Sequence, residues 1–261
     1  MKSLSLRLLI LSLVLAAAAF SSPTAFGIEP ARDFLDALRN RGYYDVALDY
    51  LDTISGNPAV PVTFKETMLY ERGLTLVQGA KFQRDIAIRE KWLNDGQQVL
   101  DQFITAQGNS PLINSARSQL GNLLVERARL KMKQSEKKVG EEKTKLYVEA
   151  RGYYDQGKVV FEKLVDELRE KLKAYPASIT EKSDPKKYEE REYLRKEFLQ
   201  AQLLVAATVE EMAETYPAGP EQSKAYAEAA DGYKKIYENY RTRLAGLYAR
   251  LYQARCNQKL G

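Results

Sequence analysis

Apolar residues recur along most of this chain at intervals of three and four positions. Phe34, Leu35 and Leu38 form one such stripe, and Leu120, Leu123 and Leu124 begin another. This spacing places apolar side chains on one face of an α-helix, whereas a half-buried strand would alternate with a period of two. Alternating segments and runs of β-branched residues are almost absent after the first 27 positions. The pattern therefore predicts an all-α fold.

Glycine- and proline-rich breaks divide this pattern into separate helices. Gly42, the segment 56–61 and the segment 108–111 are examples, and such residues interrupt or end helices. Residues 177–184 are expected to form an extended linker. The predicted helices span residues 31–41, 43–55, 62–80, 85–107, 111–136, 142–174, 185–216, 221–240 and 243–260. The longest could contain a further break, for which Gly140 and Gly157 are the candidates.

A weak repeat lies within these helices. A small residue is followed four positions later by a large apolar residue, and three positions after that by another. Positions i, i+4 and i+7 share one helical face, so the small residue permits close approach of a neighbouring helix while the large ones fill the space beside it. The four copies are Ala47, Leu51 and Ile54; Gly96, Leu100 and Phe103; Gly157, Phe161 and Leu164; and Ala229, Tyr233 and Ile236.

The N-terminal segment has the pattern of an export signal. Lys2 and Arg7 precede a run of 13 mostly apolar residues, 8–20. This run is short for a bilayer span, which needs roughly 20 residues, but suits a cleaved secretory signal. Cleavage is expected after Gly27, with a site after Ser21 as the second choice. An uncleaved anchor is the alternative, but no stable membrane insertion is expected after cleavage.

Composition excludes several kinds of chemistry. The 261 residues contain no histidine and one cysteine. The chain therefore lacks Ser-His-Asp and Cys-His nucleophile systems, histidine-bound metals and intrachain disulfides. Glu210 and Glu214 are one helical turn apart, but a di-iron site of the bundle type would also need histidine. No catalytic residue, cofactor or metal is expected, although a carboxylate pair for sugar hydrolysis stays open.

The charged residues do not form a nucleic-acid-binding pattern. The net charge is +5, and loss of Lys2 and Arg7 with the signal leaves +3. Basic and acidic residues are mixed, as where Lys138 is followed by Glu141 and Glu142. Mixed signs at this spacing are typical of a solvated helix face, whereas nucleic-acid binding would favour clustered Lys and Arg. No nucleic-acid partner is expected.

Several short segments resemble the tetratricopeptide-repeat family. In the best match, Gly42 is followed by an aromatic residue, Tyr44, and then by Ala47. Leu120-Gly121, with Leu124 after it, resembles the family's Leu-Gly-x-x-aromatic motif, and Gly73 with Leu76 is a weaker copy. The family period is about 34 residues, but the small residues of the repeat here lie 49, 61 and 72 positions apart.

This resemblance implies a fold and a function. The fold would be an α-solenoid over residues 28–261, in which antiparallel helical hairpins stack: about four hairpins and a terminal helix. The family register places Tyr70, Ser118 and Asn122 on the concave side of first helices, where such arrays bind protein or peptide partners. The interpretation is an exported, non-enzymatic scaffold in the periplasm or outside the cell.

One other interpretation of the function stays open: the chain could be the helical arm of a periplasmic cell-wall enzyme whose catalytic domain lies beyond residue 261. A helical-bundle sensor or coiled-coil spacer is a third possibility, but the sequence lacks the sustained heptads that would support it.

The last predicted helix carries two further features. Leu247, Leu251 and Ala254 form an apolar face without an evident partner, so residues 1–261 are interpreted as a possible fragment of a longer protein; a naturally short solenoid is the alternative. Cys256 is expected to fill a small buried position, the functional alternative being a redox-active or intermolecular thiol.

Overall fold

The computed structural model describes residues 31–176 and 178–261, which form ten helices and no strand. The predicted signal segment 1–27, with its cleavage sites, lies outside the described residues. The helices are α2 (Ala31–Asn40), α3 (Tyr44–Ser55), α4 (Val62–Lys65), α5 (Met68–Ala80), α6 (Ile86–Ala106), α7 (Ile113–Ser135), α8 (Gly140–Lys173), α9 (Pro185–Ala213), α10 (Pro220–Asn239) and α11 (Leu244–Leu260). The all-α prediction is confirmed for this part of the chain.

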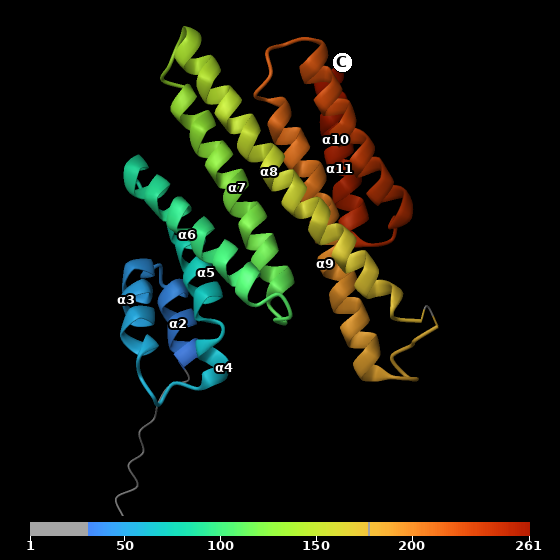
Figure 1. Ribbon diagram of the computed structural model, residues 1–261. Coiled ribbons are helices and arrows are strands. Elements are labelled where there is room, and N and C mark those ends of the chain that lie inside the picture. Colours follow the sequence, from blue (N-terminus) through green and yellow to red (C-terminus); the bar gives the residue numbers. More distant parts are fainter. Residues whose placement is uncertain (1–30, 177) are drawn as a thin grey trace, which may run out of the picture.

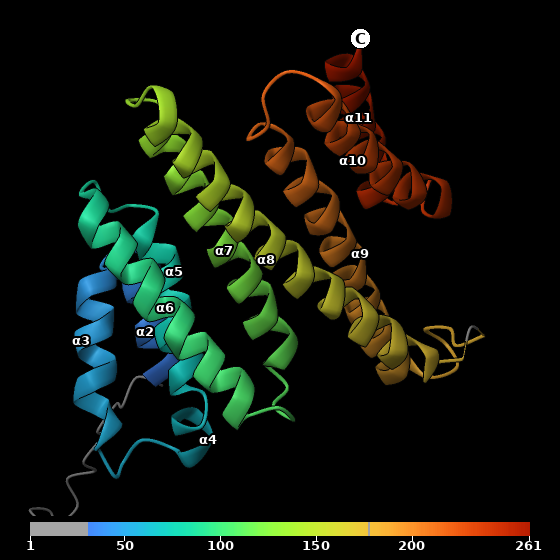
Figure 2. The same cartoon turned by 45° about the horizontal axis from the view of Figure 1, so that its top comes forward.

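Consecutive helices pack against one another along the chain. Figures 1 and 2 show the helices following one another across the molecule, from α2 and α3 at one end to α10 and α11 at the other. We call α2, α5, α7, α9 and α11 the first helices, and α3, α6, α8 and α10 the second helices. The buried apolar residues form five clusters along this series, so each pair contributes to the burial of its neighbours.

All twelve residues of the sequence repeat are buried. Two consecutive pairs also make the same contact from the first helix. A methyl group added at Gly73 of α5 would lie 2.7 Å from Leu100 Cδ2, and one added at Gly121 of α7 would collide with the ring of Phe161. Leu100 and Phe161 are the same member of the repeat. Glycine is therefore required in both first helices because the second helix lies so close.

The single helix predicted over residues 62–80 is wrong, because the structure has two helices there. The chain turns at Glu66 and Thr67, between α4 and α5. The hydroxyl of Thr67 donates a hydrogen bond to the carbonyl oxygen of Phe64 at 2.8 Å, and it accepts one from Arg32 at 3.2 Å. A threonine that bonds to nearby backbone competes with the regular helical pattern, which accounts for the break.

The two glycines proposed as breaks have different outcomes. Gly140 begins α8 and has a positive φ of 62°. Glycine adopts this backbone conformation readily because it has no Cβ. Gly157 lies inside the continuous 34-residue helix and breaks nothing. A Cβ there would lie 3.4 Å from the carbonyl oxygen of Gly121, an ordinary van der Waals distance, so Gly157 faces α7 but a small side chain would also fit.

Candidate functional site: a polar pocket between first helices

A pocket of about 170 Å³ opens where three first helices meet. From α5 it is lined by Tyr70, and from α8 by Leu164. Helix α7 contributes Asn114, Ser115, Ser118 and Gln119, and α9 contributes Glu197, Gln200 and Ala201. Most of these side chains can donate or accept hydrogen bonds.

Two of the three residues predicted for partner binding line this pocket. Tyr70 and Ser118 are 48 positions apart in the sequence, on α5 and α7, and the packing of these helices brings them to one site. Asn122 is one turn further along α7, half-buried, and is not among the lining residues. The family register thus selected two residues that line the pocket and one that does not.

Tyr70 forms the wall of the pocket on α5. Its side chain is buried, and its ring packs against that of Phe103, with 5.7 Å between ring centroids. Burial raises the pKa of the Tyr70 hydroxyl, and the charge of Glu71 raises it further. The hydroxyl therefore stays protonated at neutral pH and can both donate and accept a hydrogen bond.

The lining contains one carboxylate, Glu197. The hydroxyl of Tyr193 donates to Glu197 Oε1 at 2.8 Å, and this bond, more than burial, raises the pKa of Tyr193. The side-chain oxygen of Asn114 accepts a hydrogen bond from Lys171 at 2.9 Å. The pocket thus offers neutral donors and acceptors beside one negative charge, an arrangement suited to polar or cationic groups.

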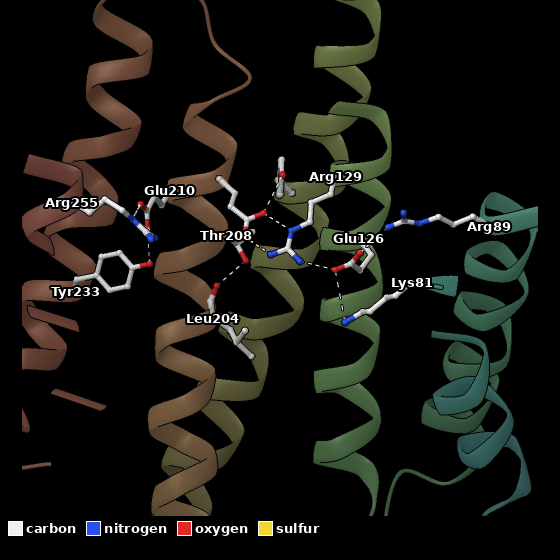
Figure 3. A network of polar contacts seen from close by, with 11 residues as sticks. Lys81, Arg89, Glu126, Arg129, Leu204, Thr208, Glu210, Tyr233 and Arg255 are labelled. Carbon is white, nitrogen blue, oxygen red and sulfur yellow. Dashed lines mark hydrogen bonds and ion pairs between the residues drawn. The ribbon is translucent and has the colours of Figure 1, made fainter. Parts of the chain in front are cut away.

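A chain of ion pairs around the buried Glu126 and the half-exposed Arg129 connects α6, α7 and α9, as Figure 3 shows. The Glu126 carboxylate on α7 accepts from Arg89 of α6 at 3.1 Å and from Arg129 at 2.6 Å. Arg129 also donates to Glu211 of α9 at 2.7 Å, so one cation connects two first helices. These charge-assisted bonds help to fix the spacing of α7 and α9, which both line the pocket.

A second cluster in Figure 3 fixes the C-terminal helix. Arg255 of α11 donates two hydrogen bonds to the Glu210 carboxylate on α9, at 2.6 and 2.7 Å. The hydroxyl of Tyr233 on α10 donates to the same carboxylate at 2.9 Å. Glu214 binds Tyr226 and Lys259 instead. Glu210 and Glu214, the pair compared above with di-iron ligands, therefore each hold α10 and α11 against α9.

Sequence reasoning missed Glu197 as a lining residue and Glu126 and Glu210 as buried acids. The prediction that mixed charges are solvated fits Lys138 and Glu142, which form an exposed pair at 2.6 Å. It does not fit Glu126, whose side chain is 9% exposed. A signal was present, because Glu126 lies three residues after Leu123 and four before Leu130, a spacing that places it on the apolar face of the helix.

Cys256 is fully buried between α11 and its neighbours, as its small-residue position suggested. Burial raises the pKa of its thiol to about 12, and the charge of Glu210 adds to the rise. A thiol that stays protonated at neutral pH is a poor nucleophile.

Within residues 31–176 and 178–261, no group of three or more potential ligand side chains could hold a metal ion, and no helix is long and apolar enough to cross a membrane. Neither a protein-family model nor a curated protein matches this chain.

Proposed function

We propose that this protein is an exported, non-enzymatic scaffold of tetratricopeptide-like helical pairs, and that it binds a protein or peptide partner at the pocket between α5, α7 and α9. The observation that carries the proposal is the convergence of Tyr70, Ser118 and Glu197, from three different pairs of helices, on one polar pocket. A surface assembled from several repeats suits recognition of an extended partner.

The chemistry of the pocket favours a particular kind of contact. The pocket is too small for a folded domain, but its 170 Å³ can admit a polar side chain of a partner. Tyr70 supplies a rigid aromatic anchor that loses little conformational entropy on binding. Glu197 favours a cationic group, such as a lysine or arginine side chain, over an anionic one.

The test is site-specific photo-crosslinking with a chain that begins at residue 28. A photoreactive residue replaces Asn122, beside the pocket; the control replaces Gln98, which is exposed on α6 and does not line it. In an extracytoplasmic fraction, we expect discrete crosslinked species from position 122 only. Ser118→Trp, which fills the pocket, should remove at least about nine-tenths of them, as a loss of 1.4 kcal/mol in binding would do.

Circular dichroism must show that Ser118→Trp keeps the helical content. Equal crosslinking at positions 98 and 122, or crosslinking that Ser118→Trp leaves unchanged, would contradict the proposal. Turnover of a cell-wall substrate by the isolated chain would contradict its non-enzymatic part.

A further inference from the structure

Helix α11 exposes an apolar stripe on its outer face. Gly246, Ala249, Gln253 and Cys256 are buried against the rest of the molecule. On the opposite side, Leu244, Leu247 and Leu251 are 67%, 57% and 62% exposed. With Tyr248 and Ala254 beside them, they form what we call the α11 stripe. At a rise of 1.5 Å per residue, the stripe is about 15 Å long.

The α11 stripe is accompanied by basic residues and by no acidic ones. From Leu244 to Gly261 the chain contains Arg250, Arg255 and Lys259 but neither Asp nor Glu. Arg255 and Lys259 pair with glutamates of α9. Arg250 contacts the side-chain oxygen of Gln253 and the ring of Tyr237 and forms no ion pair within the described residues. Its positive charge at the edge of the stripe is therefore not neutralised.

A groove of about 480 Å³ lies between α8 and α10, above α9. Its floor is apolar and consists of Val165, Val205, Ala206, Val209, Gly232 and Ile236. Its rim contains four acidic side chains, Glu162, Asp166, Glu228 and Asp231, and three basic ones, Lys158, Arg169 and Lys235. All four acids form ion pairs with these bases, so the rim keeps a net charge of only −1. On α8 the lining runs from residue 158 to 169, about 16 Å. We call this site the α8–α10 groove.

One polar atom in the α8–α10 groove lacks a partner. The side-chain oxygen of Gln202, on the α9 floor, is buried and accepts no hydrogen bond. A buried acceptor without a donor is unfavourable by about 1–3 kcal/mol. This oxygen is covered by the surrounding side chains, so an occupant of the groove could bond to it only if the floor rearranged.

We propose that the α11 stripe of one copy of this chain docks in the α8–α10 groove of a second copy. The two surfaces agree in length and both have an apolar centre, and the unpaired Arg250 would meet a rim whose net charge is −1. The buried side of α11 faces its own α9 and α10, so its stripe points away from its own groove. This inference is independent of the function proposed for the pocket between first helices.

The contact is heterologous, because the two copies use different surfaces. Each copy keeps a free stripe or a free groove, so further copies can add in the same way until a ring closes. Symmetric pairing of two α11 stripes is disfavoured, since it would bring the basic residues of both helices together.

Sedimentation velocity of the chain from residue 28 onward, which contains every described residue, tests this proposal with two variants. The stripe variant is Leu247→Asp with Leu251→Asp, and the groove variant is Asp166→Lys with Asp231→Lys. All four side chains are more than half exposed, so both variants should fold, as circular dichroism can verify. We expect the parent chain to associate with rising concentration, and each variant alone to associate at least about tenfold more weakly.

The mixture of the two variants is decisive. The stripe variant keeps an intact groove and the groove variant an intact stripe, so together they should form a 1:1 dimer that grows no further. A parent chain that stays monomeric would overturn the proposal. So would a groove variant that dimerises alone, which indicates symmetric stripe pairing. Binding of the monomer to phosphatidylglycerol vesicles, abolished in the stripe variant, would assign the stripe to a membrane surface instead.

Discussion

Replacing Phe161 by alanine is expected to lower the free energy of unfolding by about 3–5 kcal/mol. Phe161 is completely buried in α8, where its ring lies against Gly121 of α7 and belongs to a cluster that includes Met212 of α9. Truncation leaves a cavity that the closely packed helices cannot collapse to fill. Urea unfolding followed by circular dichroism measures the change.

Val159→Ala is the matched control for this prediction. Val159 lies two residues away on the same helix and is 62% exposed, so its truncation should change the free energy of unfolding by less than about 0.5 kcal/mol. Similar values for the two variants would mean that α8 does not pack on α7 through the repeat position.

Replacing Glu71 by leucine is expected to cost about 3 kcal/mol of unfolding free energy. Its carboxylate accepts from Arg39 of α2 at 2.8 Å, and the two side chains are only 4% and 6% exposed. The substitution leaves the Arg39 guanidinium buried, with the half-exposed Asp36 as its one remaining carboxylate. A buried charge that loses its main partner is costly because the surrounding protein solvates it poorly. Thermal and urea unfolding measure the loss.

The double variant Arg39→Met with Glu71→Leu separates this effect from a general loss of packing. It removes both charges and keeps apolar volume, so it should be more stable than Glu71→Leu alone by at least about 1 kcal/mol. If the double variant were less stable than the single one, desolvation of an unpaired Arg39 would not be the cause.

The helical class and the buried repeat positions could be predicted because they depend on local spacing. Leu100 and Phe161 lie four residues after a glycine, and that spacing alone assigns them to one face of a helix. The break at Thr67 could not be predicted in the same way. It depends on hydrogen bonds of one hydroxyl, to Phe64 and from Arg32, and an apolar period does not report such bonds.

The candidate site could be predicted only in part, for a related reason. Tyr70 and Ser118 follow from the motif register, since both lie close to the glycines that the first helices share. Glu197 has no such signal, because α9 carries no recognisable copy of that motif. Its place in the pocket depends on how α9 packs beside α7, and this long-range contact is not encoded in any short segment.

The proposed binding site requires that α7 and α9 meet at the pocket, and cysteine crosslinking measures this directly. Ser118→Cys and Gln200→Cys place two thiols on the pocket lining, 82 positions apart in sequence, while the native Cys256 stays buried. A short bifunctional maleimide should join residues 118 and 200 within the folded monomer, and should not join 118 to a cysteine at position 98. Failure to join 118 and 200, when each thiol alone reacts fully with a monofunctional maleimide, would contradict the arrangement on which the proposed function rests.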